Sequence, residues 1–162
     1  MREDDRSWTH AGVSKIKGSG SRYVRIPDRV FREESILKPG FPVLWHYEKT
    51  VGVLIATRQE LEEPNYEYSG ESRNFRAGDS EYTCGIPKAF FDDFKGRGEP
   101  KMKPRAAEKI DLPRDGWLHF VFHDRMTEGS KKSCYVLTED QFNQRFSDSD
   151  QLREIEQVPK FH

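Results

Sequence analysis

One ordered set of short features occurs twice along this chain, and it limits the fold more than any other property. The segment 24–31, VRIPDRVF, has the same form as the segment 84–91, CGIPKAFF. In both places a Pro/Gly turn, two strand patterns and a polar exit beginning with Thr57 or Thr138 follow in the same order. Five features in one order predict an internal duplication of a β-rich half-unit. Two ordinary strand–turn–strand segments that share common turn residues are the alternative.

The strand patterns form two predicted hairpins. Residues 41–47, FPVLWHY, and 51–57, VGVLIAT, are rich in β-branched and aromatic residues and flank a polar turn. Residues 118–123, LHFVFH, and 133–138, SCYVLT, have the same character in the second copy. Short helices are predicted after Pro27, over 28–34, and after Thr138, where Gln141 completes a capping box.

We therefore expect a mainly β protein with short helices, in which two half-units form a small β-barrel. The barrel is either an intrachain pseudo-dimer or an interleaved dimer of two chains. The expected segments are a flexible tail at 1–12, a first half-unit at 13–61, a linker or surface loop at 62–80, a second half-unit at 81–142 with a basic insert at 92–109, and a helical tail at 143–162.

Composition narrows the class of protein. Hydrophobic residues make up 34% and charged residues 34% of the 162 residues, so a partner subunit such as a second copy can help to bury a lean core. The N-terminal decapeptide has no apolar region of a secretory signal, and no apolar run is long enough to span a membrane. The two cysteines, Cys84 and Cys134, form no CxxC motif, which fits a reducing cytoplasm.

A local basic run is the best nucleic-acid candidate, because the formal net charge of −1 gives no global attraction to phosphate. The run has Asp28 as its only acidic residue, and its cations are Lys15, Lys17, Arg22, Arg25, Arg29 and Arg32. Lysine and arginine neutralise phosphates, and arginine also pairs with guanine edges. A solvated basic strand paired with the acidic Glu33 and Glu34 is the alternative.

Residues 15–57 resemble the AbrB/MazE-like swapped-hairpin family. The resemblance rests on the segment 25–32, RIPDRVFR, followed by 37–43, LKPGFPV, which reproduce a basic strand ending in Ile-Pro, a short helix, a Lys-Pro-Gly turn and a hairpin. The tandem copies are also similar to MraZ-type regulators, although the acidic-then-basic signature of those proteins is missing before Pro27 and Pro87.

The resemblance implies a transcription regulator that binds double-stranded DNA without a cofactor. Lys15, Lys17 and Arg29 would clamp phosphates, while Arg22 and Arg25 would contact base edges or a groove. The second copy has acidic residues before Ile86 where the first has basic ones, so we expect it to have lost DNA contact. Its insert carries Lys95, Arg97, Lys101, Lys103 and Arg105, which form either a second phosphate patch or a solvated loop.

Other constellations predict no enzyme and no metal site. His119 and His123 lie four apart on one predicted strand face and are a minor metal candidate beside Asp124 and Cys134. The chain has no GxSxG, Walker or GxGxxG motif. The aromatic residues Trp45, Tyr47, Trp117, Phe120, Phe122 and Tyr135 are interpreted as core, with a stacking platform for single strands as the alternative.

One rival function is an antitoxin-like or adaptor module that keeps the fold without binding DNA. In that case the segment 144–162 would wrap a protein partner and become ordered on binding.

Overall fold

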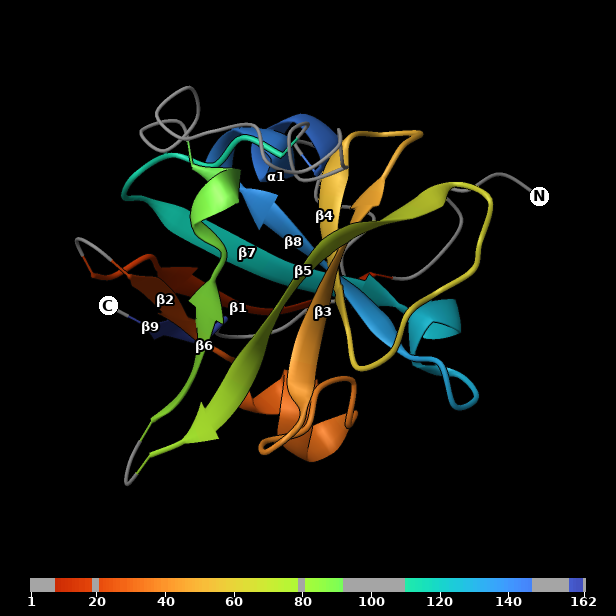
Figure 1. Ribbon diagram of the computed structural model, residues 1–162, viewed down its shortest axis with the longest axis horizontal. Helices are drawn as coiled ribbons and strands as arrows, with labels where there is room; N and C mark the ends of the chain where they lie inside the picture. Colours follow the sequence, from red (N-terminus) through yellow and green to blue (C-terminus); the bar gives the residue numbers. More distant parts are fainter. Residues whose placement is uncertain (1–7, 19–20, 79–80, 92–109, 147–157, 162) are drawn as a thin grey trace.

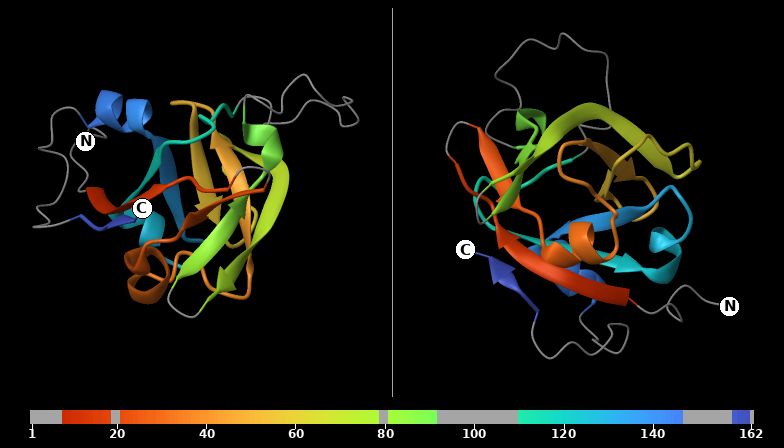
Figure 2. Two further views of the ribbon diagram at one scale, coloured as in Figure 1. Left: turned by 90° about the vertical axis from the view of Figure 1, so that its left-hand side faces the viewer. Right: turned by 90° about the horizontal axis from the view of Figure 1, so that it is seen from below.

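The computed structural model describes residues 8–18, 21–78, 81–91, 110–146 and 158–161, and it is mainly β. The strands form one highly curved sheet in the order β2-β6-β5-β3-β4-β8-β7-β1-β9, which wraps into a nearly closed barrel (Figures 1 and 2). The strands are β1 (Trp8–Lys15), β2 (Arg22–Arg25), β3 (Pro42–Glu48), β4 (Val53–Thr57), β5 (Tyr66–Ala77), β6 (Tyr82–Ile86), β7 (Trp117–His123), β8 (Ser133–Thr138) and β9 (Lys160–Phe161).

The two predicted hairpins are confirmed as β3–β4 and β7–β8, and they share one pairing register. Leu44 pairs with Thr57 in the first hairpin, and Leu118 pairs with Thr138 in the second. On its other side Leu44 pairs with Ser72 of β5, just as Leu118 pairs with Ser14 of β1.

Two further strand pairs, β2 with β6 and β4 with β8, join the first half of the chain to the second. Val24 of β2 pairs with Cys84 of β6, and these are the residues at matching positions in the repeated motif. Likewise Ile55 of β4 pairs with Tyr135 of β8, and Leu54 with Val136. This register is the one that a two-fold relation between the halves requires, while the duplication itself stays a prediction.

Two segments differ from the expectation. The segment 62–80, predicted to be a linker or loop, contains β5, a strand of 12 residues that pairs with β3 and β6 (Figure 1). The predicted flexible tail at 1–12 includes the first part of β1, where Trp8 and Ala11 are buried; residues 1–7 lie outside the described part. Both segments lack the alternation of apolar and polar residues that predicts a strand. They are stabilised as strands by pairing with their neighbours.

The helices are shorter than predicted. The helix expected over 28–34 is a single turn at Arg29–Glu33, and a three-residue turn at Lys88–Phe90 follows β6. The capping box is confirmed: Gln141 N donates to Thr138 Oγ1 and Thr138 N donates to Gln141 Oε1, which begins α1 (Glu139–Arg145). The tail expected to be helical contains the end of α1 and the strand β9, while residues 147–157 of this tail and the insert at 92–109 lie outside the described residues.

The barrel interior is a continuous apolar core. Trp45 and Phe120 are fully buried, and Phe90 packs against Trp45 with ring centroids 6.1 Å apart. Phe122 and Tyr135 are also buried, so four residues of the predicted aromatic set belong to packed layers. A second small core lies between α1 and the outer face of β1 and β7. Its members are Trp8, His10, His119, His123, Phe142 and Phe146.

Candidate nucleic-acid interface

A cleft opens on the barrel where β5 and β6 separate. These strands pair only between Phe75–Ala77 and Tyr82–Cys84, after which β5 continues along β3 and β6 continues along β2. The cleft has a volume of about 490 Å³. Its lining residues come from β2, β5, β6 and the turn after β6, and they are Ser21, Arg22, Tyr23, Arg73, Asn74, Arg76, Thr83, Gly85, Ile86 and Lys88.

Cationic side chains dominate this lining. Arg22, Arg73, Arg76 and Lys88 line the cleft, and none of its described lining residues carries a carboxylate. Arg76 and Lys88 are exposed, so their charges face solvent at the cleft rim. Cations gathered around a concave surface focus a positive potential there, although the whole chain has a net charge of −1.

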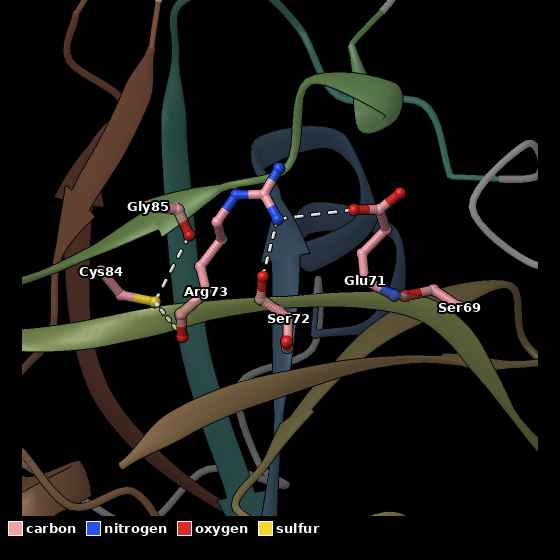
Figure 3. Close-up of polar contacts among 6 residues, drawn as sticks. All are labelled: Ser69, Glu71, Ser72, Arg73, Cys84 and Gly85. Atoms are coloured by element: carbon pink, nitrogen blue, oxygen red, sulfur yellow. Dashed lines mark hydrogen bonds and ion pairs between the residues drawn. The ribbon is translucent and has the colours of Figure 1, made fainter. Parts of the chain in front are cut away.

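Arg73 spans the gap between the two separating strands (Figure 3). Its Nη1 donates to the Ser72 carbonyl at 2.6 Å and lies 3.4 Å from Glu71 Oε1. The side chain passes Gly85 of β6, where an added Cβ would lie 3.6 Å from Arg73 Cγ and Cδ. The arginine side chain thus packs along the backbone of Gly85, and Glu71 offsets part of its charge.

Arg22 enters the cleft from the start of β2. Its guanidinium carbon lies 4.6 Å from the centroid of the Phe91 ring, a cation–π contact that fixes the direction of the side chain. The neighbouring Tyr23 is 39% exposed, and it lines the same cleft. With the hydroxyls of Ser21 and Thr83, the site offers both charged and neutral hydrogen-bond donors, which is the set that phosphodiester groups accept.

Only Arg22 of the six predicted DNA-contacting residues lies in the cleft. Lys15 lies over Trp117 at 5.5 Å, and the backbone of Lys17 bonds to that of Tyr23. Arg25 is half-buried against Phe161, with its guanidinium carbon 4.2 Å from the ring centroid. Arg29 and Arg32 form ion pairs on the helical turn with Glu33 and Asp28, at 3.6 and 3.8 Å.

Sequence reasoning missed the three other cations of the cleft. Arg73 and Arg76 lie in the segment interpreted as a linker, and Lys88 follows the second Ile-Pro step. A useful signal was present, because Tyr66, Tyr68 and Phe75 are strand-forming aromatics within that segment. Recognising a strand there would have placed its arginines beside the second copy.

A chain of hydrogen bonds lies away from the cleft, beneath α1. His10 Nε2 is 3.0 Å from His119 Nδ1, and His119 Nε2 is 2.5 Å from Glu139 Oε1. A carboxylate only accepts, so His119 carries its proton on Nε2 and His10 donates from its own Nε2 when both rings are neutral. Phe142 stacks on both rings at centroid distances of 4.5 and 4.2 Å.

Burial controls the titration of this pair. Desolvation, followed by the charge of His119, lowers the pKa of His10 to about 4, and Glu139 opposes the shift. Desolvation also lowers the pKa of His119, against the hydrogen bond and the charge of Glu139. His119 thus has protein partners, and within the described ranges no group of three or more His, Cys, Asp or Glu residues has the arrangement of a metal site.

The thiols are structural in character. Burial raises the pKa of both Cys84 and Cys134 to about 12, and for Cys84 the charge of Arg73 opposes this shift. A thiol with such a pKa is a weak nucleophile at neutral pH.

Comparison of the chain with protein-family models, curated proteins and solved structures found no match. In the part of the chain that the structure describes, no helix has both the length and the apolar character needed to cross a bilayer.

Proposed function

We propose that this protein binds double-stranded DNA and regulates transcription, as an AbrB-like barrel in which two swapped-hairpin half-units lie in one chain. The observation that carries the proposal is the cleft between β2, β5 and β6. Four cationic side chains from separate parts of the sequence converge on it, in a chain without an overall positive charge.

The chemistry of the cleft suits a phosphate backbone. Arg22, Arg73, Arg76 and Lys88 provide cations whose binding to phosphates releases counterions. Tyr23, Ser21 and Thr83 provide the neutral donors that position a duplex. Of the basic run, Arg22 lines this cleft, while Lys15, Lys17 and Arg29 lie outside it.

Fluorescence anisotropy with a labelled duplex of about 25 base pairs tests the proposal, in a salt series from about 50 to 300 mM. We expect affinity to fall steeply with salt. Arg76→Glu and Lys88→Glu should each weaken binding by about tenfold at about 100 mM salt, since each replaces a phosphate contact by repulsion.

The matched control is Lys131→Glu, which makes the same charge change at an exposed residue outside the cleft. Equal losses in the control and the cleft variants would mean that only net charge matters. Absence of binding by the unaltered protein at about 50 mM salt would overturn the proposed function.

A further inference from the structure

The strand β9 lies beside β1 on the edge opposite to β7 (Figures 1 and 2). It runs parallel to β1, with Lys160 paired to Val13 and Phe161 paired to Ser14. Val13 N donates to the Pro159 carbonyl at 2.9 Å. This short strand therefore takes an edge that the first half of the barrel would otherwise present.

Phe161 of β9 covers one cation of the first half, Arg25, whereas Lys160 lies on the Trp117 indole beside the exposed Lys15. The Phe161 ring lies against the Arg25 guanidinium at 4.2 Å, and Lys160 Nζ lies 4.6 Å from the Trp117 centroid. Lys15 Nζ is 5.5 Å from the same indole. The Phe161 ring also lies beside Gly12, where an added Cβ would lie 3.4 Å from Phe161 Cε2.

The pairing register relates this covered edge to the cleft. Ser14 and Ser72 occupy the same position beside the leucines Leu118 and Leu44, so Lys15 corresponds to Arg73. In the β2–β6 pair, Val24 opposite Cys84 makes Arg25 correspond to Gly85. The edge of β1 that pairs with β9 is therefore equivalent to the edge of β5 that faces the cleft at Ser72.

The two places differ in what fills them. Beside β5 no strand within the described residues pairs with Ser72 on the cleft side, and the Arg73 guanidinium bonds to its carbonyl instead. Beside β1 the corresponding residue, Ser14, pairs with Phe161. The cleft is thus open and cationic, while β9 occupies the corresponding place beside β1, next to Arg25.

We propose that β9 is an internal cover of a second DNA-contacting groove, in which Arg25, near the exposed Lys15, contacts phosphate once the strand has left. The proposal rests on the proposed function, because the covered groove would bind the same ligand as the cleft. A strand of two residues has few backbone hydrogen bonds, so its displacement is a local change that leaves β1 paired with β7.

Two variants expose the groove. Deletion of residues 159–162 removes the cover together with one lysine, so a gain in DNA affinity cannot come from added charge. Phe161→Ala keeps Lys160 and removes only the ring on Arg25. The matched control is Phe41→Ala, which removes an exposed aromatic ring that contacts a cation, Lys38, outside both grooves.

We expect the deletion and Phe161→Ala to tighten duplex binding by roughly three- to tenfold and to steepen the salt dependence by about one unit of log–log slope, as one added phosphate contact requires. The control should change neither quantity. Arg25→Ala in the Phe161→Ala background should cancel the gain.

The outcomes separate the two proposals. Binding by the unaltered protein that depends on Arg76 but is unchanged by either variant would overturn the cover and leave the proposed function in place. Absence of binding by the unaltered protein and by both variants would overturn the proposed function. Binding that appears only in the variants would support the cover and refute a functional open cleft.

Discussion

Acidification from neutral pH should destabilise this protein through His10. His10 is only 8% exposed, and burial lowers its pKa from 6.5 to about 4. A folded-state pKa below the unfolded value means that the unfolded chain binds more protons below pH 6.5. The stabilisation from neutral His10 is therefore complete above pH 6.5 and declines as the pH falls towards 4.

The magnitude follows from the width of this window. Between pH 6.5 and pH 5 the imidazole of His10 is charged in the unfolded chain but stays neutral in the folded protein. This interval covers 1.5 pH units. At about 1.4 kcal/mol for each unit, His10 should lower the free energy of unfolding by about 2 kcal/mol at pH 5 relative to pH 7.5. His119 and His46, whose pKa values are also lowered by burial, add to the loss in the same direction.

Urea unfolding at pH 7.5 and pH 5.0 measures this term when the protein is compared with His10→Gln. The glutamine amide can still donate towards His119 Nδ1, but it does not titrate. The unaltered protein should lose about 2 kcal/mol more stability than the variant over this pH range. If both proteins lose the same amount, the reasoning from His10 burial is refuted.

Two further predictions concern stability at pH 7.5. Thr138→Ala should lower the free energy of unfolding by about 1 kcal/mol, because it removes the capping bond that Gln141 N makes at the start of α1. Chemical denaturation measures this loss, and an unchanged midpoint would show that the cap contributes nothing. Gly12→Ala should cost about 1–3 kcal/mol, since the new Cβ would lie 2.8 Å from Pro27 Cγ. The same denaturation series checks it, with Gly85→Ala, whose Cβ has ordinary 3.6 Å contacts, as the tolerated counterpart.

The parts of the fold that sequence reasoning found are those whose pattern is local. Both hairpins have β-branched and aromatic runs, and the Thr138–Gln141 cap is contained within four positions. The strand β5 was missed because most of its residues are half-buried or exposed, and only Ser69 and Phe75 are buried. Its pairing with β3 and β6 is a tertiary effect that leaves little hydrophobic periodicity.

The sequence predicted only the part of the candidate site that lies in a local pattern. Arg22 lies in a basic run that is visible in the sequence, whereas Arg73, Arg76 and Lys88 reach the cleft only when β5 and β6 fold against β2. The cover on Arg25 depends on Phe161, which is distant in sequence. Contacts between segments that are distant in sequence leave no local pattern from which they could be predicted.

The pairing of β2 with β6, and of β4 with β8, has a consequence for how the chain folds during synthesis. The first half leaves the ribosome with β2 lacking β6, and with β4 paired to β3 but lacking β8, because β6 and β8 belong to the second half. Contacts this distant in sequence make folding slow, and they leave strand edges exposed until the second half has been translated. The nascent first half is thus the species most prone to aggregate, and a chaperone that shields strand edges should raise the yield of folded protein.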